Sequence, residues 1–258
     1  MHVTHISSAA NPRLKFAKSL KKRRNRRKQQ RILLEGHRLI ADSMSAGFPP
    51  ALFFFTPEAA QAHPALLQQA ADAGAQLLSL EPALLGEISD TVTPQGVIAV
   101  APLPELPVGQ KGLALVLDGV RDPGNLGTLL RSAAAADADQ VILMPGVTDP
   151  WSPKTLRAGM GAHFRIAIRE AQTPDQARAW LQHHAIHFAN ARGECAYTDV
   201  DWTRASALIL GGETERAGIV DGWSDVIAIA IPMARGIESL NVAVAGSVIL
   251  FEAARQRS

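Results

Sequence analysis

Short apolar runs and longer mixed stretches alternate through roughly the first hundred residues of the chain. A short apolar run bounded by glycine, proline or polar residues is typical of a buried strand. Apolar residues that recur every three or four positions are typical of a helix. These patterns predict strands at residues 32–34, 52–55, 76–78 and 97–100, and helices beginning at Arg13, at 37–45, at 58–73 and at Pro82. Such alternation predicts one small α/β domain.

Prolines and glycines are concentrated directly after this region. They are Pro102, Pro104, Pro107, Gly109 and Gly112. Stretches of this composition resist regular structure and often separate domains. We therefore predict a first domain at residues 1–103, a linker at 104–112 and a second domain at 113–258.

The second domain contains continuous apolar runs, the pattern of strands buried on both faces of a parallel sheet. We predict strands at 113–117, 141–144, 164–168, 186–189, 208–210 and 226–231, and helices at 128–136, 153–160, 174–183 and through the closing segment to Arg257. Ligands of open α/β sheets bind at the carboxyl ends of the strands. We therefore expect the chemistry in the polar loops that follow these strands.

The composition is that of a globular protein, with 47% hydrophobic and 19% charged residues in a chain of 258. No apolar run approaches the roughly 18 residues that a membrane span needs, and the N-terminus has no signal-peptide pattern. Cys195 is the single cysteine, so no disulfide can form within the chain, which fits a reducing compartment. We expect a cytoplasmic protein with no membrane partner.

Positive charge is concentrated at the N-terminus. Residues 1–38 contain 12 of the 26 lysines and arginines but only one of the 24 acidic residues. A block of like charge is typical of a segment that binds a polyanion, although a solvated surface helix would look similar. Because no aromatic residues interleave the basic run 21–28, base stacking there is not expected. The candidate nucleic-acid contacts are Arg13, Lys21, Lys22, Arg23, Arg24, Arg26 and Arg27.

Common nucleotide-binding and hydrolytic motifs are missing from the sequence. There is no P-loop, no G-x-S-x-G elbow and no H-E-x-x-H. The nearest approach to the dinucleotide fingerprint, at 159–164, lacks the third glycine and leads into a predicted strand, the reverse of what that turn requires. His183, His184 and His187 are close in sequence but lack neighbouring acids or cysteines, so we predict no metal site.

Three polar loops contain the remaining candidates for functional residues. Residues 118–131 read D-G-V-R-D-P-G-N-L-G-T-L-L-R, residues 210–213 read L-G-G-E, and I-P-M at 231–233 is followed by E-S-L-N at 238–241. In order and separation these resemble the three signatures of the SpoU/TrmH family of RNA 2′-O-ribose methyltransferases, within the SPOUT superfamily. Asn11-Pro12, the basic run and Leu34-Glu35-Gly36 are similar to the small substrate-binding domain of many such enzymes.

The resemblance implies a small N-terminal α/β RNA-binding domain followed by an α/β methyltransferase domain whose parallel sheet is tied in a trefoil knot. It also implies S-adenosylmethionine bound in the knotted loops of a homodimer, with the active site completed across the interface. The positions that match the family's cofactor contacts are Gly211, Ile231 and Leu240. The positions that match its catalytic residues are Asn125, Arg131, Glu213, Ser239 and Asn241.

The residue types suit these roles. A guanidinium is a poor base, so we expect Arg131 to bind an RNA phosphate and to stabilise the developing alkoxide. Glu213 could order loops or act as a carboxylate base. Ser239 and Asn241 could hold a hydroxyl or phosphate, or cap the last helix, or both. The loop after Glu213 departs from the family because its glycine, Gly218, comes five positions after the glutamate rather than three.

The prediction is therefore an S-adenosylmethionine-dependent enzyme that methylates ribose 2′-hydroxyls of ribosomal RNA. Transfer RNA is the alternative substrate. A catalytically silent RNA-binding protein of the same fold also remains open. A nucleotide-dependent oxidoreductase is disfavoured because the glycine fingerprint is missing.

Overall fold

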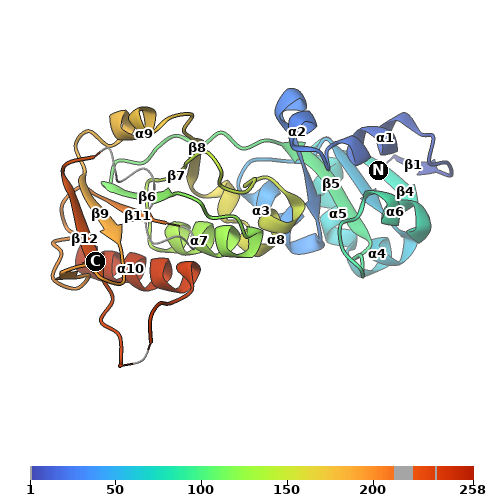
Figure 1. Ribbon diagram of the computed structural model, residues 1–258. Coiled ribbons are helices and arrows are strands. Elements are labelled where there is room, and N and C mark those ends of the chain that lie inside the picture. The colour runs from blue at the N-terminus through green and yellow to red at the C-terminus, as the bar shows by residue number, and fades with distance from the viewer. Residues whose placement is uncertain (1, 212–222, 236) are drawn as a thin grey trace. The chain divides into compact units, whose positions relative to one another are not determined.

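The computed structural model describes residues 2–211, 223–235 and 237–258 (Figure 1). The chain divides into two compact units. Unit 1 contains the described residues up to Pro104 together with Asp149–Phe164, and unit 2 contains Glu105–Thr148 together with the described residues from Arg165 onwards. Segment 149–164 was expected in the second domain, but its contacts place it in unit 1.

The described part of unit 1 contains a five-stranded sheet with the order β1-β4-β3-β5-β2. Strand β5 runs antiparallel to both of its neighbours, while β1, β4 and β3 run parallel to one another. The strands are β1 (Val3–Ile6), β2 (Arg31–Glu35), β3 (Leu52–Phe55), β4 (Gln76–Leu80) and β5 (Val97–Pro102). The helices are α1 (Pro12–Ser19), α2 (Arg23–Gln29), α3 (His37–Ser45), α4 (Pro57–Ala62), α5 (Pro64–Asp72), α6 (Pro82–Ile88), α8 (Pro153–Gly159) and the short η1 (Ala162–Phe164).

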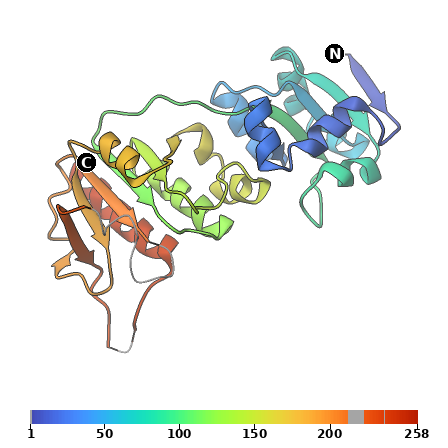
Figure 2. The same cartoon turned by 45° about the horizontal axis from the view of Figure 1, so that its top comes forward.

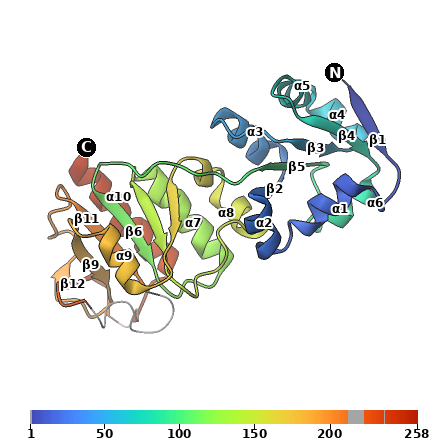
Figure 3. The ribbon, with the colours of Figure 1, turned by 90° about the horizontal axis from the view of Figure 1, so that it is seen from above.

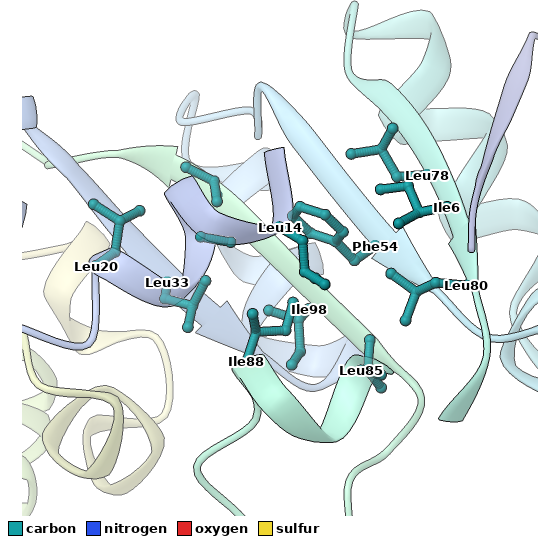
Figure 4. Close-up of a cluster of buried hydrophobic side chains, with 12 residues drawn as sticks. Ile6, Leu14, Leu20, Leu33, Phe54, Leu78, Leu80, Leu85, Ile88 and Ile98 are labelled. Atoms are coloured by element: carbon teal, nitrogen blue, oxygen red, sulfur yellow. The ribbon is translucent and has the colours of Figure 1, made fainter. Parts of the chain in front are cut away.

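One face of this sheet is covered by α1 and α6, which contribute Leu14 and Leu85 to a fully buried apolar cluster (Figure 4). The sheet contributes Phe54 and Ile98 to the same cluster. Helix α1 begins where it does because the Asn11 side chain accepts from the Arg13 N–H and Pro12 occupies the first turn. Burial of this cluster fixes α1 on the sheet.

The elements of unit 1 differ from the sequence prediction in three places. Strand β1 was not predicted, and α2 is a helix of its own because Lys22 has an extended backbone that separates it from α1. The single helix predicted at 58–73 is two helices, α4 and α5. A residue before proline is pushed out of the helical region, and His63, which precedes Pro64, has φ −132° and ψ 51°.

The described part of unit 2 contains a seven-stranded sheet in which every pairing is parallel, with the order β10-β12-β9-β11-β6-β7-β8. The strands are β6 (Leu113–Leu117), β7 (Gln140–Leu143), β8 (Ala167–Glu170), β9 (Ala185–Ala189), β10 (Cys195–Ala196), β11 (Ser206–Leu210) and β12 (Val226–Ala230). The helices are α7 (Pro123–Ala135), α9 (Pro174–Trp180) and α10 (Val242–Arg257). The predicted parallel sheet is confirmed. The strand predicted at 164–168 forms instead at β8, after the turn of η1.

Helices cover both faces of this sheet, with α9 on one face and α7 and α10 side by side on the other (Figures 1, 2 and 3). The α9 face buries Val116, Phe188 and Ile209 with Ala177 and Leu181. Strands buried on both faces explain the continuous apolar runs of the sequence.

The chain order reverses at the centre of this sheet, because β6 is flanked by β7 on one side and by β11 on the other. The resemblance also implies a trefoil knot, and residues 212–222, which connect β11 to β12, lie outside the described residues. None of the described helices is long and apolar enough to cross a membrane.

Candidate functional site

The site is built at the carboxyl edge of the unit 2 sheet, where the chain order reverses. Leu117 and Leu210, the last residues of β6 and β11, are paired in register, and the Asp118 N–H donates to the Leu210 carbonyl at 3.0 Å. Gly211 therefore begins next to the loop 118–122 that leads into α7. Parallel strands place the ends of their loops at one edge, which is where α/β proteins bind ligands.

The sequence D-P-G-N sets the start of α7. The Asp122 carboxylate accepts from the Asn125 N–H at 2.8 Å, and Pro123 follows in the first turn. This cap fixes Asn125 in the first turn of the helix, half-buried at the sheet edge. Arg131 lies further along α7 and is exposed. Their separation of six positions turns the two side chains to different sides of the helix, as expected.

Asn241 connects α10 to the same place. Its side-chain oxygen caps α10 by accepting from the backbone N–H groups of Ala243 at 2.9 Å and Val244 at 3.3 Å. Its side-chain nitrogen donates to the Asn125 Oδ1 at 3.2 Å. The fold thus brings together two predicted site residues that are 116 positions apart. Of the two roles left open for Asn241, the cap is confirmed, and the role of a site residue stays a prediction.

The contact between α7 and α10 holds this pair in place. The hydroxyls of Ser132 and Ser247 are 2.7 Å apart, and the Ser247 hydroxyl also donates to the Ala243 carbonyl at 2.6 Å. Gly246 lets the helix approach closely, because a Cβ there would lie 2.4 Å from the Leu210 Cδ1. None of these small residues carries a sequence signal by itself, so sequence reasoning missed them.

A pocket of about 390 Å³ lies beside the ends of β9 and β12. This size falls within the range of small-ligand pockets. Gly193 permits the close approach of its loop to β12, because a Cβ there would lie 2.6 Å from the Ile229 carbonyl carbon. The residues that line the pocket are Ala191, Gly193, Glu194, Ala196, Ala230, Ile231, Pro232, Met233, Ile237 and Glu238.

The lining fits the cofactor that the sequence implies. Ile231, Met233 and Ile237 offer apolar surface for a flat heterocycle, and small residues on the opposing loop leave it room. The carboxylates of Glu194 and Glu238 can accept from hydroxyls or face a positive charge. Sequence reasoning missed the loop 191–196. Its position directly after a parallel strand is the signal that could have found it.

The other predicted cofactor and catalytic residues that the structure describes lie at different positions in unit 2. Ile231 lines the pocket, and Gly211 is half-buried at the end of β11. Ser239 and Leu240 are exposed in the segment before α10, and Leu240 retains 40% of its accessible surface. Glu213 lies outside the described residues.

Of the predicted nucleic-acid contacts, Arg26 has a different role. It is only 3% exposed, and its guanidinium donates to the Leu20 and Lys21 carbonyls at 2.5 and 2.8 Å and pairs with Asp149. These bonds hold α2 against segment 149–164 within unit 1, so Arg26 is not available to RNA. The pattern of a basic run could not reveal that one of its members faces inwards.

The remaining cations of the run lie at the surface. Lys21 is half-buried and donates to the Ser89 carbonyl at 2.5 Å, and the Arg13 Nε donates to the Gln76 side chain at 2.9 Å. Besides Arg13, the exposed members are Lys22, Arg23, Arg24, Arg27 and Lys28. They present a positive surface on α1, α2 and the turn between them.

The glycines of the incomplete dinucleotide motif have a packing role. A Cβ at Gly159 would lie 2.5 Å from the His163 ring, and a Cβ at Gly161, which has φ +82°, would lie 2.6 Å from the Asp42 carboxylate. His163 is fully buried, and burial lowers its pKa to about 4. His187 is buried beside Trp202 in unit 2, and burial also lowers its pKa.

Both parts of the chain match models of known protein families. The family model described as SpoU rRNA Methylase family matches residues 112–251, and the MRM3-like substrate binding domain matches residues 11–99. The mitochondrial rRNA methyltransferase 3 of Mus musculus is 34% identical over 92% of this chain and 70% of its own length. A 23S rRNA guanosine 2′-O-methyltransferase of Bacillus subtilis is 28% identical over 95% of this chain and 97% of its own.

A solved structure extends the likeness to three dimensions. The crystal structure of an AdoMet-bound rRNA methyltransferase from Sinorhizobium meliloti is 28% identical, with a TM-score of 0.84 and 98% of each chain covered. The family model spans more than half of this chain, including all three signature loops. The chain therefore belongs to the SpoU rRNA methylase family.

Proposed function

We propose that this protein transfers a methyl group from S-adenosylmethionine to a ribose 2′-hydroxyl of ribosomal RNA. The observation that carries the proposal is the hydrogen bond between Asn125 and Asn241. This pair lies at the sheet edge where the strand order reverses, and Asn241 follows shortly after the pocket residue Glu238 in the chain. The relatives supply the substrate class, since those from mouse and Bacillus subtilis are named rRNA methyltransferases.

S-adenosylmethionine, when bound, supplies an electrophilic methyl group on a positively charged sulfur. In the transfer, a lone pair of the ribose 2′ oxygen forms the new O–C bond, the electrons of the S–C bond return to sulfur, and the 2′ proton leaves. Much of the catalysis is therefore positioning. Ile231, Met233 and Ile237 would hold the cofactor's adenine, and a glycine at position 211 would let the backbone at the end of β11 come near it.

The Asn125–Asn241 pair orients the RNA. Because the Asn125 oxygen accepts from Asn241, the Asn125 amide nitrogen is left to donate. An amide donor at this edge suits a ribose or phosphate oxygen of the target nucleotide. The cap on α10 prevents Asn241 from turning away, so the pair is set before RNA binds.

Arg131 is the cation of the site. Its side chain is exposed on α7 and makes no hydrogen bond or ion pair with another described residue. It binds an RNA phosphate and stabilises the alkoxide that develops as the 2′ proton leaves. Glu213 orders its loop or accepts this proton, and Ser239 holds a hydroxyl or phosphate oxygen.

Unit 1 captures the RNA. Its matched family domain is a substrate-binding domain, and its exposed cations on α1 and α2 can neutralise several backbone phosphates. Transfer RNA is the alternative substrate that this surface would also attract. We assign RNA capture to residues 1–103 and catalysis to residues 113–258. Segment 149–164 lies within unit 1, the unit that captures RNA.

The active protein is a homodimer. Val244, Val248 and Phe251 lie on one face of α10 and expose 49%, 37% and 52% of their surface, while the opposite face of the helix is buried on the sheet. A helix that is apolar on both faces packs on both. A second copy of this chain would cover the stripe next to Asn241. A mass near 27.5 kDa in sedimentation at working concentration would contradict this assembly.

A cytoplasmic location, which fits the single cysteine, belongs to the same proposal.

The test is methyl transfer from labelled S-adenosylmethionine to ribosomal RNA that lacks modifications, with transfer RNA in parallel. Ribose methylation makes the adjacent phosphodiester resistant to alkali, which maps the site. One resistant position in ribosomal RNA is the expected result. Transfer to tRNA alone would select the alternative substrate. Absence of both transfer and cofactor binding would favour a silent RNA-binding protein.

A further inference from the structure

The cofactor pocket has an unusual balance of charge. Among the described residues that line it, Glu194 and Glu238 are the ones whose side chains carry polar atoms. Glu194 comes from the loop after β9 and Glu238 from the segment before α10, so the two carboxylates belong to different walls. The other lining side chains are small or apolar.

Neither carboxylate is neutralised by a neighbouring group among the residues that the structure describes. Neither makes a hydrogen bond or ion pair with another residue in the described part of the chain, and both are exposed to the pocket side or to solvent. The arginines of the same two segments, Arg192 and Arg235, do not line the pocket. Among the described residues, the walls of the pocket therefore present negative charge without a matching cation.

The reaction changes the charge of the molecule in this pocket. S-adenosylmethionine carries a positive sulfur, and the product that remains after methyl loss, S-adenosylhomocysteine, carries a neutral thioether. Apart from the methyl group the two molecules have the same adenine, ribose and amino-acid parts. A negatively charged wall attracts the sulfonium and lacks that attraction for the thioether.

We infer that Glu194 and Glu238 make the pocket select the cationic cofactor over its neutral product. This inference rests on the proposed function. The selection has a consequence for turnover, because loss of the sulfur's charge weakens the hold on the product and so favours its release. The two glutamates act here as specificity-determining residues and need not touch the transferred methyl group.

The test measures the dissociation constants of S-adenosylmethionine and S-adenosylhomocysteine by calorimetry on the full-length protein. The selectivity is the ratio of the product constant to the cofactor constant. Because the carboxylates are solvent-exposed, Glu194→Gln should lower this ratio by about three- to fivefold. Glu194→Asp should retain most of it. Raising the salt concentration should lower the selectivity ratio of the wild-type protein. It should change the ratio of the double variant Glu194→Gln/Glu238→Gln less.

The control is Glu105→Gln, which removes an exposed carboxylate of unit 2 that does not line the pocket. It should leave the ratio unchanged. If Glu194→Gln weakened the binding of both ligands equally, the inference would be overturned. Such a result would show that the carboxylate contacts a part of the molecule that cofactor and product share. An unchanged ratio in the double variant would overturn it as well. Failure of the wild-type protein to bind either ligand would instead refute the proposed function.

Discussion

At the scale of single residues, Asn241 shows how one side chain can serve both the fold and the site. Its oxygen caps α10, and its nitrogen donates to Asn125. The two roles use different atoms of one amide, so they can be separated by substitution. A side chain that keeps the oxygen but loses the N–H should retain the cap and lose the pair.

Asn241→Asp is that substitution. It should leave the free energy of unfolding within about 0.5 kcal/mol of wild type, because aspartate caps helices as well as asparagine does. Methyl transfer should fall roughly 10- to 100-fold, since the donor that orients Asn125 is gone. Asn241→Ala should lose the same activity and about 1 kcal/mol of stability. Urea denaturation and turnover measure both. Full turnover by Asn241→Asp would show that the pair does not orient the substrate.

His163 makes the stability of unit 1 depend on pH. Its Nε2 lies 2.8 Å from the Pro150 carbonyl, its Nδ1 has no partner in the described part of the chain, and burial lowers its pKa from 6.5 to about 4. The folded state therefore favours the neutral ring. The stabilisation is complete above the unfolded pKa and is lost as the pH falls from 6.5 towards 4.

Between pH 7 and pH 5 this one group should reduce the free energy of unfolding by about 2 kcal/mol. His163→Gln should flatten that part of the pH profile, whatever its stability at pH 7. The matched control is His183→Gln, which changes an exposed imidazole and should leave the slope as in wild type. Urea titrations at pH 5, 6 and 7 give the slope. A profile as steep as wild type in His163→Gln would assign the pH dependence to other groups.

At the scale of elements, the site depends on how closely α10 approaches α7 and β11. Gly246 sets that distance, since a Cβ there would lie within 2.5 Å of side-chain carbons of both Leu210 and Leu129. The Ser132–Ser247 contact lies on the same interface. A wider gap would move the start of α10, and with it Asn241, away from Asn125.

Gly246→Ala should therefore destabilise the protein by about 1–3 kcal/mol, even though alanine is the better helix former. Transfer activity should fall with it. Gly86→Ala is the matched control, because Gly86 is also helical but has open space where the Cβ would go. That variant should be stabilised by up to about 1 kcal/mol. Thermal unfolding compares the two. Equal stabilisation of both would contradict the close packing at Gly246.

At the scale of the whole molecule, charge is divided between the two units, to which we assign RNA capture and methyl transfer. The exposed cations of α1 and α2 lie in unit 1, whereas the proposed cofactor pocket of unit 2 is lined by the carboxylates Glu194 and Glu238. Arg26 does not contribute to the positive surface, because it is buried against Asp149. RNA affinity and cofactor affinity should therefore respond to different substitutions.

Neutralising Lys22, Arg24 and Lys28 to glutamine together should weaken binding to ribosomal RNA and reduce the slope of log affinity against log salt by about 2. Calorimetric binding of S-adenosylmethionine should not change. Arg26→Gln should behave differently and lower the stability by about 3 kcal/mol, because it leaves Asp149 without its buried partner. An unchanged salt slope in the triple variant would locate RNA binding elsewhere.

The sequence by itself determined the fold class, the parallel sheet and the family. Apolar runs indicate strands buried on both faces. The three signature loops are contiguous segments, so their residue types can be recognised without a structure. Asn241 could be named as a possible cap of the last helix for the same reason, since a cap is a local interaction. The cap at Asp122 was not predicted, and α7 begins at Pro123 rather than at residue 128. The charge asymmetry likewise needed only counting.

Tertiary structure decided the features that depend on contacts between distant segments. It placed Asn125 beside Asn241, turned Arg26 into the interior, packed segment 149–164 on unit 1, and put Glu194 into the pocket wall. Local pattern cannot reveal these, because the burial and the partner of a side chain are set by which segments the chain brings together. A basic run or a glycine motif has the same letters whether a member faces solvent, a ligand or the core.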